Sequence, residues 1–315
     1  MPEKESLFEK IDITKYSVKK LVAIPLIILL VSLALLTSTQ LSINSPVHLG
    51  MDFRGGTWVK ISTDETREEL IAKFSDYPVT LIADTGVGNE RRIEFDLTSS
   101  SQKYDLLIDM LNKEYGVGTY EIESISPVFG EQYQTQALRA LTIAFVLMAI
   151  VVFIVFRTFI PPLAVIFAAF SDIVIAVACM NVIGMELSLG TVAALLMLIG
   201  YSVDSNILLT TNLLRKKGEL NEKVRNAMRT GITMTSTTLS AVFAMFLVSF
   251  YLDISILRAI SVVLLFGLTM DLLNTWLLNA GILRWYVERK ERKKYKRRGV
   301  EEAKVKMKKK GKSIK

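Results

Sequence analysis

The sequence predicts an α-helical polytopic membrane protein with six transmembrane helices and one external α+β domain between the first and second spans. Two observations predict this fold. Apolar segments long enough to cover the roughly 30 Å hydrocarbon core occur six times. The chain between the first two has the mixed periodicity of strands and amphipathic helices instead. Because hydrocarbon offers no partner to unpaired backbone groups and the segments lack barrel-type alternation, each span is expected to be helical.

The apolar segments divide the chain into an N-terminal segment (1–20), the external domain (42–137), the spans and a tail (284–315). The first span is expected to be retained, since no small-residue cleavage site is obvious and five spans follow it. The spans are expected at residues 21–41, 138–156, 160–183, 187–214, 231–252 and 254–283.

Charge predicts the orientation. Lys and Arg gather in the alternate flanks and the tail, and the opposite turns carry Glu186 and Asp253 without any basic residue. The positive-inside rule therefore places both termini in the cytoplasm, as a multi-pass protein of the cell membrane. The tail has 16 Lys or Arg against 4 Glu, whereas residues 42–133 have 16 acids against 8 bases. A basic tail beside the cytoplasmic face favours anionic lipid as its partner, and no nucleic acid is expected.

The external segment has the order of a ferredoxin-like βαββαβ domain. Its second helix ends at Gly116, and Gly86 to Asn89 is expected to form a hairpin turn rather than a phosphate loop, because no helix N-terminus follows it. Strands are expected at 48–63, 79–83, 91–97 and 119–126, and helices at 64–77, with Asp64 as its cap, and 100–115.

Three acids lie inside the spans and are the candidate functional residues: Asp172, Asp204 and Asp271. An ionised carboxylate in a span costs on the order of 3 kcal/mol on insertion scales, so such acids are expected to face the bundle interior and to serve a function. Burial favours the protonated form, which suits proton coupling. Asp271, near Asn274 and Asn279, has a purely structural role as its alternative.

Arg229 is the candidate cationic partner for Asp204. It lies at the cytoplasmic mouth of the fifth span. Hydroxyl side chains follow it at helical spacing and are expected either to line a polar path or to tie helices together. These residues are Thr233, Ser236, Thr237 and Ser240.

Cys179 and His48 stand alone in the chain, so no disulfide framework, metal site or cofactor is expected. Asp172 and Asp204 on successive spans resemble the acid pair of intramembrane aspartyl proteases, but the surrounding residues do not match that motif. Since two acids alone define no reaction class, the chain is not expected to be an enzyme.

Several motifs resemble the SecF family of protein-export membrane subunits. Gly50-Met-Asp52-Phe53-Arg-Gly55-Gly56-Thr57 is similar to its G-x-D-F-x-G-G-T signature, and Gly200-Tyr201-Ser202-Val-Asp204-Ser-Asn to the fourth-span motif of SecD and SecF. Ser171-Asp172 is similar to the third-span acid, and the segment from Arg229 to Thr238 to the start of the fifth span. The Val-Asp-Ser-Asn form is closer to SecD than to bacterial SecF and resembles archaeal members. The acid is thereby displaced by one residue, about 100° around the helix.

The resemblance implies a fold that is half of a resistance-nodulation-division transporter. It also implies a subunit that pairs with SecD and works with a SecYEG-type channel. The pair would use the proton gradient to help a translocating preprotein leave the membrane. Two alternatives stay open. One is a passive scaffold subunit of the translocase without proton coupling. The other is a half-transporter of the same superfamily, although such exporters normally carry two six-span halves in one chain.

Overall fold

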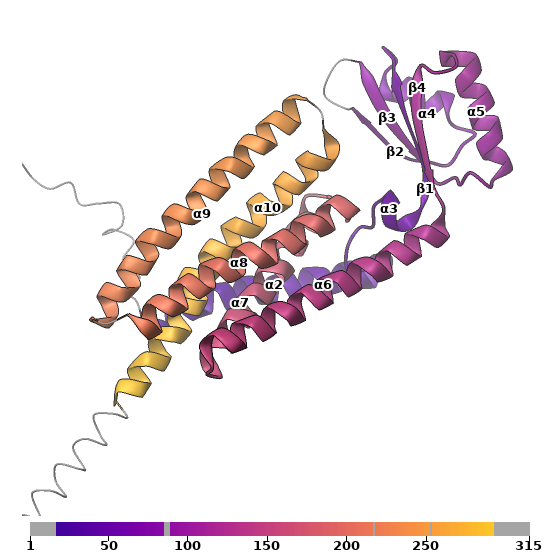
Figure 1. The fold of residues 1–315 in the computed structure, drawn as a ribbon. Coiled ribbons are helices and arrows are strands. Elements are labelled where there is room, and N and C mark those ends of the chain that lie inside the picture. Colours follow the sequence, from indigo (N-terminus) through magenta and orange to yellow (C-terminus); the bar gives the residue numbers. More distant parts are fainter. Residues whose placement is uncertain (1–16, 85–88, 217, 253, 293–315) are drawn as a thin grey trace, which may run out of the picture.

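The computed structural model describes residues 17–84, 89–216, 218–252 and 254–292, which form a helical bundle with an α/β domain at one end (Figure 1). Six of the described helices are long and apolar enough to cross a membrane. They are α2 (Val18–Ile43), α6 (Pro127–Phe156), α7 (Ile160–Val182), α8 (Leu189–Arg215), α9 (Leu220–Tyr251) and α10 (Ser255–Leu273), which continues through the π-helical turn η2 (Asn274–Asn279) as a helix to Arg292.

Two of the helices extend well beyond the predicted apolar segments. Helix α6 begins at Pro127 rather than near Leu138, and α9 begins at Leu220 rather than at Gly231. Proline suits the first turn because its φ is already helical and its missing N–H would be unpaired there. Hydropathy detects only the part of a helix that suits hydrocarbon, so polar helical extensions escape it.

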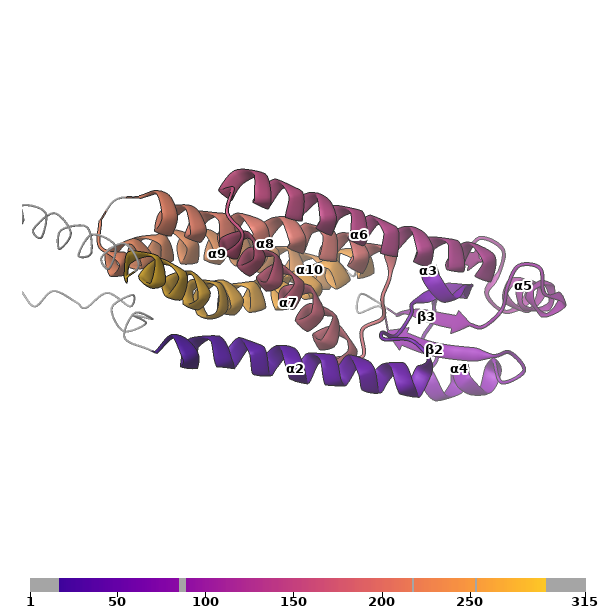
Figure 2. The same ribbon diagram turned by 90° about the horizontal axis from the view of Figure 1, so that it is seen from below.

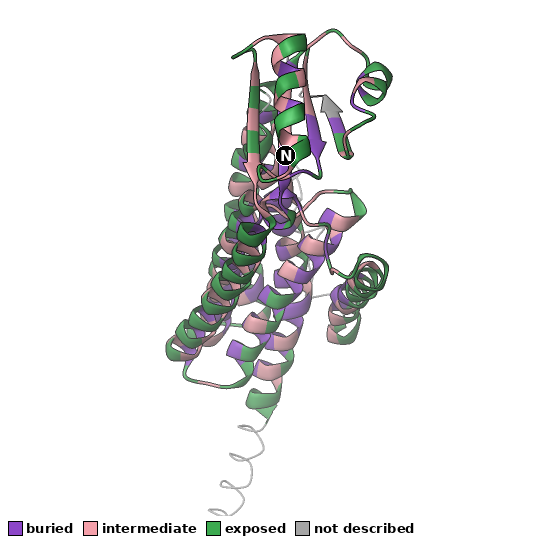
Figure 3. Cartoon of the chain, turned by 90° about the vertical axis from the view of Figure 1, so that its right-hand side faces the viewer, coloured by how far each residue is buried: buried purple, intermediate pink, exposed green. Residues whose placement is uncertain are grey.

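The centre of the bundle is formed by α7 and α8 together with α10, whereas α6 and α9 expose most of their surface (Figure 3). Helix α8 starts with a capping box: Thr191 N donates to Ser188 Oγ at 3.2 Å, and Ser188 N donates to Thr191 Oγ1 at 2.8 Å. Two of the four otherwise unpaired amides of the helix start are thereby satisfied.

The α/β domain has one four-stranded antiparallel sheet with the strand order β2-β3-β1-β4. Along β1, Val59 lies between Ile93 of β3 and Ile122 of β4. Alternate residues of the strands join Leu70 and Leu107 of the two helices in one buried core. The elements are β1 (Gly56–Ser62), α4 (Arg67–Lys73), β2 (Val79–Asp84), β3 (Glu90–Phe95), α5 (Gln102–Tyr115) and β4 (Tyr120–Ile125).

The start of the domain differs from the expectation. The predicted strand at 48–63 is divided, because a short helix, α3 (Met51–Arg54), precedes β1. Gly55 at φ 79° and Gly56 at φ 134° take backbone conformations that residues with a Cβ rarely adopt, and these allow the chain to turn from α3 into the strand. The hairpin turn expected at Gly86 to Asn89 lies largely outside the described residues.

The first domain helix is shorter than predicted, and its cap is Thr66 rather than Asp64. Thr66 and Glu69 form a capping box, in which each side chain accepts from the backbone N–H of the other residue. Asp64 instead accepts a hydrogen bond from Asn89 at the start of β3. Thr66 therefore caps the helix because Glu69, three positions later, completes the capping box.

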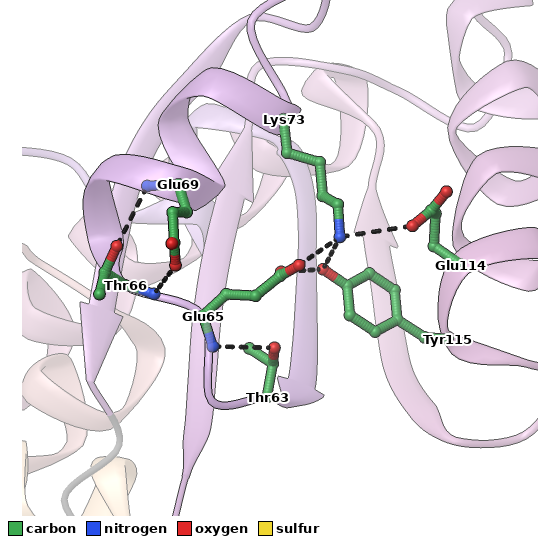
Figure 4. A network of polar contacts seen from close by, with 7 residues as sticks. All are labelled: Thr63, Glu65, Thr66, Glu69, Lys73, Glu114 and Tyr115. Atoms are coloured by element: carbon green, nitrogen blue, oxygen red, sulfur yellow. Dashed lines mark hydrogen bonds and ion pairs between the residues drawn. The ribbon is translucent and has the colours of Figure 1, made fainter.

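A polar cluster joins α4 to the end of α5 (Figure 4). Glu65 accepts hydrogen bonds from Lys73 and from Tyr115 Oη, the latter at 2.6 Å, and Lys73 Nζ also pairs with Glu114 at 3.4 Å. Burial alone would raise the pKa of the Glu65 carboxyl, but the bonds from Lys73 and Tyr115 lower it overall. Burial, followed by the bond to Glu65, raises the pKa of Tyr115 to about 12.

The domain connects to the bundle through α2 and α6, which lie on either side of the connection (Figure 2). The described start of α2 and the described end of α10 both lie at the opposite end of the bundle (Figures 1 and 2). The domain and the two described chain ends therefore occupy opposite ends of the molecule.

Candidate functional site

Two of the three predicted acids meet in the centre of the bundle. Asp172 of α7 and Asp271 of α10 are 0% and 1% exposed. Their carboxyl groups lie close enough to interact electrostatically. This pair is the centre of the candidate site.

Hydroxyl and amide donors surround the Asp172 carboxyl. Ser202 Oγ of α8 donates to Oδ2 at 2.6 Å, and Asn274 Nδ2 of η2 donates to Oδ1 at 2.6 Å. The Asn274 amide also donates to Ser171 Oγ at 3.0 Å. Asp172 is thus held by two other helices besides its own.

Asp271 has its own donors. Ser205 Oγ of α8 lies 2.9 Å from Oδ2 and 3.1 Å from Oδ1, and Thr275 Oγ1 donates to Oδ1 at 3.1 Å. The network continues away from the acids, since Asn206 Nδ2 lies 3.3 Å from Ser202 Oγ and Asn279 Nδ2 donates to Asn206 Oδ1 at 2.6 Å. Both carboxyls therefore belong to one polar network across α7, α8, α10 and η2.

The π-helical turn supplies the network residues beyond Asp271. Asn274, Thr275 and Asn279 all lie within η2 and are all buried. π-Helical turns inside α-helices are rare and frequently occur at functional sites. Trp276 in the same turn packs against α9, where a Cβ added at Gly231 would come 2.4 Å from its Cζ2 atom. Close packing thus holds the turn against α9.

No described Lys or Arg forms an ion pair with Asp172 or Asp271, and the described residues contain no cluster of three His, Cys, Asp or Glu suited to a metal ion. Two adjacent carboxylates in a medium of low dielectric constant repel each other strongly when both are ionised. One shared proton removes that repulsion, so the arrangement is suited to taking up and releasing a proton.

The third predicted acid, Asp204, lies elsewhere. It is exposed at the surface of this chain, and the expectation that it faces the bundle interior is wrong. Ser202, Ser205 and Asn206 form the inward face of α8 at helical spacing, and Asp204 lies about 200° from Ser202 and about 100° from Ser205 around the helix. The polar side chains on the inward face of α8 therefore do not include Asp204.

Arg229 is also exposed, and within the described part of the chain it forms no ion pair with Asp204. The polar face of α9 points outward as well. Thr233 Oγ1 donates to Arg229 O at 2.8 Å and Ser240 Oγ to Ser236 O at 2.8 Å, so these hydroxyls bond their own helix. Ser236 and Thr237 are exposed too, and this face lines no interior path within the chain.

The motif residues fall into two groups. Ser202 of the fourth-span motif enters the network, Tyr201 packs in the neighbouring apolar core, and a Cβ at Gly200 would meet nothing within 4 Å. Gly50, Asp52, Phe53 and Gly55 lie instead where the domain meets the bundle. Gly56 and Thr57 start β1 inside the domain, where Thr57 Oγ1 donates to Leu97 O at 2.7 Å. The sequence did not predict Ser171, Ser205, Asn206 and Thr275 as members of the polar network. The spacings of three and four between Ser202, Ser205 and Asn206 could have indicated an inward polar face of α8.

The sequence is similar to a family of known proteins. The family described as protein export membrane protein SecD/SecF, C-terminal, matches residues 108–289. The protein-export membrane protein SecF of Methanolacinia petrolearia is 47% identical over 279 residues, which cover 88% of this chain and 97% of that protein. The SecF of Pyrococcus furiosus is 38% identical over 301 residues, which cover 93% and 100%.

The solved structures show the same fold. The crystal structure of SecDF, a translocon-associated membrane protein from Thermus thermophilus, superposes with a TM-score of 0.66 at 20% identity over 85% of this chain. The chain corresponds to only 38% of that longer protein.

Fold and site together define a polytopic membrane protein whose helices enclose a pair of acids and carry a single α/β domain. The sequence matches make the class more specific, because the relatives are similar over nearly their whole length. The chain belongs to the SecF family of protein-export membrane proteins.

Proposed function

We propose that this chain is an accessory subunit of a Sec preprotein translocase, which pairs with SecD and uses the proton gradient to assist export. The observation that carries the proposal is the buried pair of Asp172 and Asp271 without a basic partner among the described residues. A merely structural polar network has no need of two adjacent acids in the membrane, where each is costly.

The proposed step is a change of helix packing. A proton on the pair removes a negative charge and turns one carboxyl from an acceptor into a donor. Donors to the pair come from α8 and from η2, so the preferred arrangement of these elements differs between the two protonation states. Proton entry on one side and exit on the other would then alternate the two packings.

Asp204 supports the pairing with SecD. A carboxylate facing lipid costs on the order of 3 kcal/mol, so its exposed position on α8 favours a polar partner that covers it. The exposed hydroxyls of α9 are consistent with a second helix bundle at this chain's surface. We infer that Asp204 exchanges a proton at the boundary with SecD, and that Arg229, exposed on α9, is the candidate cation on the cytoplasmic side.

The charge distribution supports an orientation with both termini in the cytoplasm and the α/β domain outside. The domain has the βαββαβ order and the strand order of a ferredoxin-like fold, and it would face the emerging preprotein beside a SecYEG-type channel. The basic tail would bind anionic lipid at the inner face.

The test is preprotein export by vesicles that contain this chain, its SecD partner and the channel, with and without a proton gradient. Asp172→Asn and Asp204→Asn keep the size of the side chain and one acceptor oxygen but cannot titrate. If every cycle needs the proton, each should lower gradient-dependent export by about tenfold or more. Recovery of SecD with the variant should stay unchanged. Asp109→Asn, at an exposed position of α5, is the matched control and should export normally.

Gradient-dependent export at the wild-type level in both Asn variants would contradict proton coupling. The passive scaffold, which needs only the assembly of the subunits, would then be the better account.

A further inference from the structure

The segment between α2 and β1 is hydrogen-bonded to the loop that precedes α8. Leu187 N donates to His48 O at 2.7 Å, and Gly50 N donates back to Leu187 O at 2.8 Å. These bonds make Leu49 and Leu187 an isolated parallel bridge. The entrance of the α/β domain is thus bound to a loop more than a hundred residues later in the chain.

Asp52 continues this connection onto α8 itself. Its Oδ2 atom accepts a hydrogen bond of 2.8 Å from Leu189 N, the amide of the first residue of the helix. The capping box of Ser188 and Thr191 satisfies other groups at this end, so Asp52 adds a partner that belongs to the domain entrance. An acid there also opposes the positive end of the helix dipole.

The contact is closely packed. A Cβ at Gly50 would lie 2.8 Å from Leu187 O, and a Cβ at Gly130 of α6 would lie 2.6 Å from Phe53 O. Gln134 Nε2 of α6 donates to the same carbonyl at 2.7 Å. Helix α3 is therefore held between the start of α8 and α6, and only Gly55 separates it from β1.

Helix α8 connects this contact to the acid network. Leu189 and Ser202 lie on one uninterrupted helix, about 20 Å apart at 1.5 Å per residue. Ser202 and Ser205 bond the two buried acids, and Leu189 bonds Asp52. A shift of α8 along or about its axis thus reaches the domain directly, in addition to the covalent routes through α2 and α6.

We propose that Asp52 is a positioning residue that couples the α/β domain to α8, so that a change in the acid network moves the domain. The inference rests on the proposed function, because it assumes that the network changes with its protonation. The coupling depends on one hydrogen bond, which Leu189 N donates to the Asp52 carboxylate.

The test measures the distance between spin labels on the domain and on the bundle, with the full chain and SecD in lipid. Labels at Ser62→Cys, on the exposed end of β1, and Tyr251→Cys, at the exposed end of α9, require Cys179→Ser and Glu186→Gln as background. Glu186 lies in the same contact beside Gly50 and has a titratable carboxyl, so the Gln variant leaves the buried acids as the source of the shift. The distance distribution should shift between pH values at which the buried carboxyls, followed by infrared spectroscopy, are protonated and ionised.

Asp52→Ala should lose this shift while the infrared titration persists. Asp52→Asn should retain it, because the amide oxygen still accepts from Leu189 N. Leu189→Pro should also lose the pH-dependent shift, because it removes the donor of the same hydrogen bond. It removes the N–H at the first helical position, where proline is well tolerated, so a folding defect is not expected. Asp109→Ala on α5 is the control and should behave as wild type.

A pH-dependent shift of wild-type size in Asp52→Ala or Leu189→Pro would overturn the coupling through Asp52 and leave the proposed function intact. An unchanged distance in the wild type, with titrating carboxyls, would overturn it as well. Carboxyls that do not titrate in the wild type would contradict the proposed function itself.

Discussion

At the scale of single residues, the direction in which each acid points decides its role. Asp172 and Asp271 point into the bundle, where each accepts hydrogen bonds from its own donors on α8 and η2, whereas Asp204 points out of it. The same helix therefore bonds the internal pair through its serines and carries an exposed acid on another face.

Glu186, in the loop before α8, gives a prediction about stability and pH. Burial, and then the nearby Glu94, raise the pKa of its carboxyl, although Arg54, Arg92 and His48 act in the opposite direction. Folding therefore favours the neutral form of Glu186 relative to the unfolded chain, so the stability of the folded protein falls as the pH rises through the raised folded-state pKa. Below the ordinary value of 4.5 this penalty is absent.

Glu186→Gln should consequently be more stable than the wild type at neutral pH, with the difference disappearing near pH 4 and below. Thermal unfolding of the detergent-solubilised protein across this pH range measures it. Glu131 and Glu186 both line a cleft of about 470 Å³ beside the domain entrance. Glu131→Gln, at an exposed position of that cleft, is the matched control for the loss of a carboxylate there and should not reproduce the gain. A Glu186→Gln protein that is equally destabilised at every pH would contradict the assignment.

At the scale of secondary-structure elements, close helix contacts hold η2 in place. Gly231 lets α9 approach Trp276, and Gly267 of α10 lets Leu198 of α8 approach, because an added Cβ would come within 2.4 Å and 2.5 Å of those side chains. Gly200 of α8 has open space where a Cβ would lie. Gly231 and Gly267 are therefore needed for close helix contacts, whereas Gly200 is not.

Substitution by alanine separates these cases. Gly231→Ala should lower the free energy of unfolding by about 1–3 kcal/mol, the usual cost of overpacking. Gly200→Ala is the matched control and should be neutral or more stable by about 0.5–1 kcal/mol, since alanine is the better helix former. Unfolding of both variants in a mild detergent measures the difference. Equal stabilities would show that η2 does not depend on the contact between Trp276 and Gly231.

The sequence allowed the helices and the order of strands and helices along the chain to be predicted, since these follow from composition and periodicity. The functional role of the acids stays a prediction. It did not predict η2, because no simple period distinguishes a π-helical turn from an α-helix. The inward turn of Asp172 and the outward turn of Asp204 depend on which neighbours surround each helix. Asp52 could be recognised only as a motif residue, because its partner Leu189 lies far away in the chain.

At the scale of the whole molecule, the bundle carries its domain at one end and its described chain ends at the other (Figure 2). Together with the basic flanks, this arrangement predicts cytoplasmic termini and an external domain. Cysteines placed at Ser99 in the domain and at Ser313 in the tail, in a Cys179→Ser background, test it with a membrane-impermeant thiol reagent on intact cells. Ser99→Cys should react and Ser313→Cys should not; the reverse pattern would overturn the orientation.

In the proposed mechanism, the buried acid pair holds an exchangeable proton. Infrared difference spectroscopy of the protein in lipid with SecD measures this directly, because a protonated carboxyl has a C=O stretch that a carboxylate lacks. A titrating carboxyl band should be present in the wild type and in Asp204→Leu, and it should be lost or displaced in Asp172→Asn and in Asp271→Asn. A wild-type spectrum without such a band at any pH, or a band unchanged in both Asn variants, would contradict the account.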